Sequence, residues 1–274
     1  MIDILNTRLA CITGVAVTLF ATGVAHADSS SLPGKAKLDT VVPSGPTSAH
    51  SGAPAQWATP VEDNAIHHYF LLDRAEYGMQ NGTNNYLWEG TGWIGGDYNR
   101  LWLKTSGEGP VHGGPTESAQ FQVKYGRSIT PYFSAQAGIR YDTNPTPTRG
   151  FAVFDLNGLA PYWFEMENQL YVSDDGKVSF NGEYSYEFLL TQKLILQPRA
   201  EFTVAASNAR HYNLGSGLRN TEMGLRLRYE IRREFAPYIG VRWDQKYGDT
   251  KDMLRAAGES TSSTAFVVGI RAWY

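Results

Sequence analysis

From His67 to the last residue, the chain alternates between apolar and polar positions in runs of roughly 9 to 13 residues. The clearest run is KLILQPRAEFTV (193–204), and a second is TEMGLRLRYEI (221–231), where Leu225 and Leu227 alternate with charged neighbours. Successive side chains of a strand point to opposite sides, so each run predicts a β-strand with one apolar and one polar face. No segment after His67 has the period of an amphipathic helix, and the predicted fold class is all-β.

The runs define about twelve strands, whose lengths suit tilted strands that cross a bilayer. Their expected ranges are 67–80, 84–94, 98–106, 117–127, 132–142, 149–158, 161–173, 177–189, 193–206, 218–231, 235–247 and 263–274.

The connections between these strands fall into two groups. Alternate connections, near 96, 130, 160, 191 and 233, are tight turns. Of the others, those at 106–117, 143–148, 207–217 and 248–262 are long, and those at Asn81-Gly82 and Asp175-Gly176 are hairpin turns. Short turns on one side and long loops on the other are typical of an antiparallel outer-membrane barrel with both termini in the periplasm. A soluble sandwich would not sort its loops this way.

The chain ends on FVVGIRAWY, which reads as the strand that closes the barrel. A closed barrel has no free edge, so this strand is expected to pair with the first along its length. The terminal Tyr274 beside Trp273 suits the membrane–water boundary, where amphipathic rings are favoured. Gly269, Ala272 and Tyr274 also resemble the C-terminal signal that the bacterial barrel-assembly machinery reads, although Val267 stands where a polar residue is usual.

The first 65 residues differ from the rest. Residues 1–27 read as a signal peptide, with Arg8, an apolar run and the small-x-small site Ala25-His26-Ala27. Residues 28–65 are rich in Ser, Pro, Gly, Ala and Thr without periodicity, which predicts a disordered periplasmic linker. The barrel is then 66–274. The single cysteine, Cys11, lies in the signal peptide, so the mature chain has no thiol chemistry.

Composition excludes several functional classes. The net charge of −3 gives no basic footprint for nucleic acid. No second apolar run is long enough for a transmembrane helix. Among the histidines of the mature chain, His50, His67, His68, His112 and His211, none lies mid-strand beside a serine on the same face, and a Ser-His site needs that proximity. The chain is therefore not expected to be an enzyme.

If the apolar face of each strand contacts lipid, the opposite face lines the interior. The charged residues expected there are Lys124, Arg140, Glu165, Glu167, Glu183, Glu187, Arg199, Glu201, Glu222, Arg226, Arg228, Glu230, Arg242, Asp244, Lys246 and Arg271. Acids and bases nearly balance, and groups so confined must pair or be hydrated. This pattern predicts either a paired network that props or plugs the barrel or a polar path for small solutes.

Metal ligands are scarce in the mature chain. His67 and His68 form an imidazole pair at the expected periplasmic mouth, but adjacent strand residues point to opposite faces. One of them could bind a metal ion from the inside while the other faces the membrane interface. The two remain the candidate metal ligands.

Several motifs resemble the copper resistance protein B family of bacterial outer-membrane proteins. They are GWIGGDYNRLWLKTSGEG (92–109), GLAPYWFEME (158–167), LTQKLILQPRAE (190–201), GSGL (215–218), GLRLRYEIRREFAPYIGV (224–241) and RAAGE (255–259). The resemblance covers essentially all of 67–274 in order. It implies a barrel in the outer membrane of a Gram-negative cell that acts in copper tolerance, with copper as a ligand and a periplasmic multicopper oxidase as a partner.

The resemblance ends at the N-terminal segment. Family members commonly carry a segment dense in Met and His there, which suits copper. The linker of this chain contains His50 and no methionine. Two hypotheses follow. In the first, the barrel binds or passes copper ions in a resistance system; in the second, it is a narrow general porin for small charged solutes without a metal role. The family resemblance favours copper.

Overall fold

Antiparallel strands make up almost all of the computed structural model, which describes residues 65–80, 82–144, 146–209 and 214–274. The predicted signal peptide and all but the last residue of the predicted linker lie outside these ranges. The strands are β1 (His67–Met79), β2 (Asn85–Gly95), β3 (Asn99–Pro110), β4 (Ser118–Ser128), β5 (Phe133–Asn144), β6 (Arg149–Ala160), β7 (Phe164–Ser173), β8 (Val178–Ser185), β9 (Phe188–Leu189), β10 (Leu194–Ala205), β11 (Gly217–Tyr229), β12 (Phe235–Lys246) and β13 (Ser262–Trp273).

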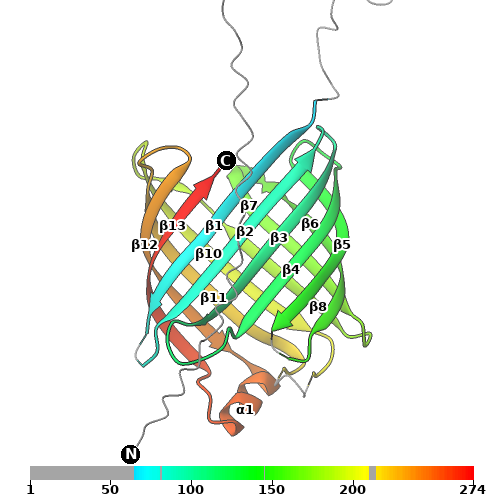
Figure 1. Cartoon of the computed structure of the whole chain (residues 1–274), viewed down its shortest axis with the longest axis vertical. Helices are drawn as coiled ribbons and strands as arrows, with labels where there is room; N and C mark the ends of the chain where they lie inside the picture. The colour runs from blue at the N-terminus through cyan, green and yellow to red at the C-terminus, as the bar shows by residue number, and fades with distance from the viewer. Residues whose placement is uncertain (1–64, 81, 145, 210–213) are drawn as a thin grey trace, which may run out of the picture. The chain divides into compact units, whose positions relative to one another are not determined.

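Each strand pairs with its neighbours in sequence, and β13 pairs with β1, so the sheet closes into a barrel (Figure 1). The seam extends to the last residue, because Tyr274 N–H donates to the Phe70 carbonyl and Phe70 N–H to the Tyr274 carbonyl, at 2.8 and 2.9 Å. Both β8 and β9 pair with β10, so together they fill one position in the wall. The barrel is therefore the predicted antiparallel all-β fold with twelve strands.

A proline explains why the predicted strand 177–189 is split into β8 and β9. Arg199 pairs with Ser185 and Leu196 with Phe188, which leaves Pro198 opposite the break. Proline has no N–H to donate to the ladder and is disfavoured inside a sheet. One bond survives there, from Tyr186 N–H to the Pro198 carbonyl at 3.2 Å.

The two ends of the barrel carry different connections. The chain's C-terminus and the short turns lie at one end, and the longer loops with helix α1 (Gly248–Ala256) lie at the other (Figure 1). The sequence predicted an irregular loop at 248–262, and α1 is a difference from that expectation. Its Thr250 is buried and its hydroxyl accepts a hydrogen bond from Gly215 N–H at 2.8 Å, which ties two long loops together. No helix in the described residues is long and apolar enough to span a bilayer.

One of the short connections also changes a predicted boundary. The strand expected from 161 begins only at Phe164, because Pro161–Trp163 form a 3₁₀ turn. Tyr162 and Trp163 take φ values of 68° and 65°, the left-handed region that a strand cannot contain. Both rings are exposed, as befits aromatic residues at a membrane interface.

The wall of the barrel has the reverse of a soluble protein's polarity. Large apolar side chains are exposed on the outside, among them Phe121, Ile139, Met223, Leu225 and Val268. Charged and amide side chains are buried on the inside, among them Arg74, Glu89, Lys124, Arg199 and Arg226. An apolar exterior around a polar lumen is the arrangement of a transmembrane barrel.

Candidate functional site

The centre of the barrel interior is built around Arg199 of β10, whose side chain is only 4% exposed. Its Nε donates to Glu183 on the neighbouring β8 at 2.6 Å, and its Nη1 to Glu222 on β11 at 3.0 Å. Its Nη2 lies 3.0 Å from Glu201 and 3.5 Å from Glu89 of β2. Because β2 and β10 are not adjacent in the wall, Arg199 joins opposite sides of the lumen.

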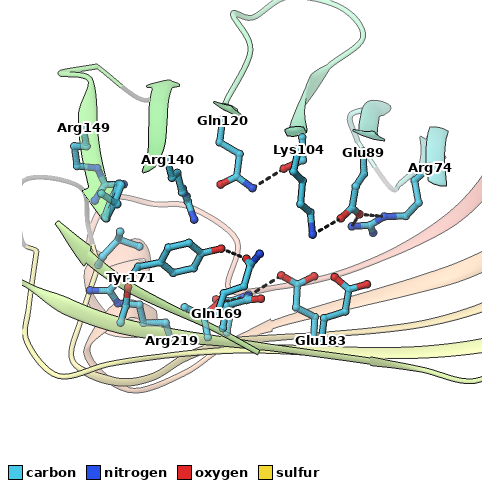
Figure 2. Close-up of a pocket in the computed structure, with 18 of the residues that line it drawn as sticks. Arg74, Glu89, Lys104, Gln120, Arg140, Arg149, Gln169, Tyr171, Glu183 and Arg219 are labelled. Atoms are coloured by element: carbon cyan, nitrogen blue, oxygen red, sulfur yellow. Dashed lines mark hydrogen bonds and ion pairs between the residues drawn. The ribbon is translucent and has the colours of Figure 1, made fainter. Parts of the chain in front are cut away.

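Arg74 and Lys104 extend this network from the other side. Arg74 of β1 lies 2.6 Å from Glu89 and donates to Glu222 at 2.9 Å. Lys104 of β3 lies 3.2 Å from Glu89 and donates to Glu167 of β7 at 2.8 Å. Figure 2 shows Glu89 between Lys104 and Arg74, with Glu183 on the facing wall. The adjacent strands β1, β2 and β3 are thus connected through the interior to the distant strands β7 and β11.

Further ion pairs continue the network around the wall. Arg226 donates to Glu76 at 2.6 Å, and Tyr238 donates to the same Glu76 oxygen at 3.1 Å. Lys124 of β4 is paired with Asp155 of β6. An ion pair removed from water is stable only when its geometry is good, and losing one partner leaves an uncompensated charge.

The remaining charged positions lie toward the two ends. At the end with the C-terminus, Arg228 and Arg271 both contact Glu187, at 2.7 and 3.2 Å, and Arg271 also donates to Asp73 at 2.8 Å. At the end with α1, the Nε of Arg242 lies 3.3 Å from Asp244. Other predicted lumen residues make looser or separate contacts: Glu230 lies 3.8 Å from Arg228, Glu165 accepts from Ser185 at 3.0 Å, and Arg140 pairs with Asp142 at 2.6 Å.

Two cavities flank the central ion pairs. An outer cavity of about 260 Å³, toward α1, is lined by Arg74, Glu89, Lys104, Ser106, Gln120, Arg140, Arg149, Phe151, Gln169, Tyr171, Ser179, Asn181, Glu183, Arg199, Glu201, Thr203, Leu214, Arg219 and Asn220 (Figure 2). An inner cavity of about 320 Å³, toward the C-terminus, is lined by Asn157, Gly158, Leu159, Glu165, Met166, Glu167, Glu183 and Ser185. Glu183 borders both, so its pair with Arg199 lies between them.

The sequence reading missed several interior residues, chiefly Arg74, Glu76, Glu89, Lys104 and Asp155. In β1 the strand pairing shifts between Leu72 and Arg74, so the alternation changes phase and hides Arg74 and Glu76. Glu89 is the single charged residue of β2, and Lys104 lies in β3 between Arg100 and Glu108. One signal was available: a charge in the middle of a membrane strand faces inward because the lipid side penalises it.

The predicted histidine pair does not converge on a single point. His67 and His68 open β1, both are exposed, and they pair with Gly95 and Ile94. The His68 ring lies 6.3 Å from the Tyr274 ring, at the seam. Within the part of the chain that the structure describes, no group of three or more His, Cys, Asp or Glu side chains is placed to hold a metal ion.

Two carboxyl groups outside the strands have shifted pKa values. Burial raises the pKa of Glu117, in the loop between β3 and β4, and the nearby carboxylates Glu108 and Glu259 raise it further. Hydrogen bonds from Lys177 and then Ser173 lower the pKa of Asp175, in the turn between β7 and β8, to about 2. At the mouth near β3, the raised pKa makes the Glu117 carboxyl harder to ionise than an ordinary one.

Comparison with known proteins agrees with the resemblance seen in the motifs. The family model described as copper resistance protein B precursor (CopB) matches residues 66–274. Copper resistance protein B of Escherichia coli is 44% identical over 214 residues, which is 78% of this chain and 72% of that protein. The copper resistance protein B homolog of Pseudomonas syringae pv. tomato (strain ATCC BAA-871 / DC3000) is 37% identical over 249 residues, or 84% of each chain.

Among solved structures, one supports the fold, and the fold alone. The NanC porin has a TM-score of 0.50 at 12% identity, covering 73% of this chain and 98% of that one. The KdgM porin has a TM-score of 0.43 at 10% identity, covering 75% and 98%. The family model spans the whole barrel, and two named relatives align over most of their length. The chain therefore belongs to the copper resistance protein B family.

Proposed function

We propose that this protein is an outer-membrane barrel that binds or passes copper ions as part of a copper resistance system, and that it is not an enzyme. The observation that carries the proposal is the family match across all of 66–274, with a relative named for copper resistance at 44% identity. The matched region contains the whole barrel and excludes the linker. The copper role is therefore assigned to the barrel.

The carboxylates that line the interior support a cation as the ligand. Glu165, Glu167 and Glu183 all border the inner cavity, near the end with the C-terminus. At the opposite mouth, Glu117 interacts electrostatically with Glu108 and with Glu259. Carboxylate groups at a mouth raise the local concentration of cations, and carboxylate oxygens can bind divalent metals.

Of the two candidate histidines, His67 is proposed as the copper ligand at the periplasmic mouth. It shares the face of Tyr69, which interacts with the interior groups Arg271 and Asp73. His68 shares the outward face of Phe70, which is 52% exposed. Neutral imidazole is a good ligand for copper. The matched pair of variants is therefore His67→Ala, expected to weaken copper binding, and His68→Ala, expected to leave it unchanged.

The proposed topology places the cleaved N-terminus, the C-terminus and the short turns in the periplasm. On this proposal the closing strand is the contact for the barrel-assembly machinery, and a periplasmic multicopper oxidase meets the end with the termini. Protease added to intact cells should cut at Arg255 in the exposed end of α1 and spare Arg232 and Arg233 in a short turn. Cleavage at Arg232-Arg233 from outside would reverse the topology.

A deletion strain tests the function. Loss of the gene should raise sensitivity to copper, and expression of the full chain should restore tolerance, while sensitivity to zinc and silver should change little. The alternative, a narrow general porin, predicts no specific copper phenotype and reduced uptake of small charged solutes. Equal sensitivity of the deletion and parent strains to copper would reject the copper role.

A further inference from the structure

Three arginines from three strands surround the outer cavity, on the side of the barrel that carries α1. Arg140 lies in β5, Arg149 opens β6, and Arg219 is near the start of β11. All three line the same cavity of about 260 Å³, and Figure 2 shows Arg140 and Arg149 on one side of it and Arg219 on the other. The cavity is large enough for a small solute with bound water.

The charges that line the outer cavity do not balance. Its lining includes six cationic side chains, Arg74, Lys104, Arg140, Arg149, Arg199 and Arg219, and three carboxylates, Glu89, Glu183 and Glu201. All three carboxylates contact Arg199 at the cavity floor. The excess positive charge therefore lies at the outer arginines.

A single carboxylate serves two of these outer arginines. Arg140 donates to Asp142 through two nitrogens, at 2.6 and 3.0 Å, and Arg149 lies 3.6 Å from the same carboxylate. Arg219 donates to the backbone carbonyls of Gly215 at 2.7 Å and Ser207 at 3.2 Å, which are neutral acceptors. Two of the three guanidiniums therefore lie beside the same carboxylate, that of Asp142.

Exposure separates these arginines from those of the central network. The side chains of Arg140 and Arg149 are 22% and 16% exposed, whereas those of Arg199 and Arg228 are 4% and 2% exposed. The central guanidiniums are enclosed by carboxylates, and the outer ones open into the cavity.

Aromatic rings hold two of the outer guanidiniums in place. The Arg140 guanidinium lies 4.7 Å from the centre of the Tyr171 ring, and the Arg149 guanidinium lies 5.2 Å from that of Phe151. Arg149 and Arg219 repel each other electrostatically. A fixed group of like charges around a cavity is stabilised when an anion enters it.

We propose that the outer cavity is a binding site for a small anion that carries carboxylate or phosphate oxygens, held by Arg140, Arg149 and Arg219. The planar guanidinium fork matches such oxygens and forms short, charge-assisted hydrogen bonds to them. This site goes beyond the proposed copper role and does not require copper, since a free metal cation would be repelled there. It gives the barrel a second ligand class at its outer end.

Calorimetry on the purified full mature chain in detergent tests the site, with citrate and inorganic phosphate as the two probes. Wild-type protein should bind at least one probe. The double variant Arg149→Gln/Arg219→Gln should bind it at least about tenfold more weakly, because each lost guanidinium removes charge-assisted hydrogen bonds. The double variant Arg149→Lys/Arg219→Lys keeps both charges but loses the planar fork of guanidinium donors. Its affinity for the probe should lie between that of wild type and that of the glutamine double variant.

Arg100→Gln is the matched control, because it removes one positive charge at the opposite end of the barrel. Arg100 donates to the Gly96 carbonyl at 3.2 Å and stacks over Trp93 at 4.0 Å. Its variant should bind as wild type does. Barrel folding is checked first by heat-modifiable migration on a gel, and if the double variant does not fold, Arg219→Gln alone decides the question, with a loss of at least about threefold expected.

Three results would overturn the proposal. The first is wild-type protein that binds neither citrate nor phosphate in the calorimeter. The second is a folded glutamine variant that binds as tightly as wild type, which would place the anion elsewhere. Equal weakening in Arg100→Gln would show that the overall charge of the chain, rather than the outer cavity, attracts the anion.

Discussion

The two faces of β11 differ because one contacts lipid and the other lines the lumen. On the outward face, Met223 and Leu225 are about half exposed, at 52% and 49%. On the inward face, Arg226 and Arg228 are almost completely buried, and each contacts carboxylates from other strands. An outward side chain contacts hydrocarbon and does not depend on a particular partner. An inward charge is stabilised by partners from distant parts of the sequence. Substitutions on the two faces should therefore destabilise the barrel for different reasons.

The largest effect is expected from Arg199→Ala, at the centre of the interior. Removing this guanidinium leaves Glu183, Glu201 and Glu222 without their shared cation. Breaking a buried ion pair by removing one partner costs about 3–5 kcal/mol. Urea unfolding of the barrel in detergent micelles, followed by tryptophan fluorescence, should show a loss of this size. Arg199→Lys, which keeps the charge, should lose less; equal losses would mean that fork geometry rather than charge dominates.

A charge on the lipid face should cost somewhat less. Leu225→Arg places a guanidinium in the middle of β11 on the outside, at an expected cost of about 2–4 kcal/mol. Leu218→Arg, at the start of the same strand near the membrane boundary, should cost only about 0–1 kcal/mol. Folding in vesicles, scored by heat-modifiable migration, measures both. Equal tolerance of the two variants would mean that this face does not contact hydrocarbon.

The seam between β1 and β13 closes the barrel, and closure is required for both the lipid-facing and the lumen-facing surface. Deleting Tyr274 removes two backbone hydrogen bonds to Phe70 and should destabilise the barrel by about 1–3 kcal/mol. The amount of assembled protein in the outer membrane should fall. Tyr274→Phe is the control, since it keeps the backbone bonds and the ring, and it should assemble normally. Full assembly of the deletion variant would show that the last residue does not contribute to closure.

The smallest effect on stability is expected at Glu117, which lies in a loop outside the membrane and belongs to neither the lipid-facing nor the lumen-facing surface. Burial and neighbouring carboxylates raise its folded pKa above the unfolded value, so its contribution to stability is present in acid and is lost as pH rises through the folded pKa. Glu117→Gln should therefore stabilise the barrel slightly at pH 7, by less than about 1 kcal/mol, and make no difference in acid. Unfolding midpoints at the two pH values measure this. A variant that is destabilised at pH 7 would contradict the sign.

The number and order of the strands, and the separation of short turns from long loops at the two ends, could be predicted from the sequence because alternation and loop length are local signals. β10 alternates throughout, β11 alternates from Asn220 onward, and the predicted ranges agree with the structure to within two residues. The prediction was wrong where a local rule is broken: the helix in 248–262, the start of β7 behind the left-handed Tyr162 and Trp163, and the interruption opposite Pro198. These depend on contacts between loops or on single backbone positions.

The interior site could be predicted only in part. Alternation identified which charges of β10 and β11 face inward, but not which of them pair. The contact between Arg199 and Glu89 joins residues 110 positions apart on opposite walls, and only the closed barrel brings them together. The change of phase in β1 also hid Arg74 and Glu76. Whether the predicted charged set and His67 serve copper stays a prediction.

The central claim is that copper is bound by the barrel and not by the linker. Equilibrium dialysis of Cu(II) against the purified mature chain tests this most directly, with a variant lacking residues 28–64 and with His67→Ala and His68→Ala. The linker has one histidine and no methionine, so the deletion variant should bind copper as tightly as the full mature chain, and His67→Ala alone should bind it more weakly. Loss of copper binding on deletion of the linker, or no binding by the full mature chain, would contradict the account.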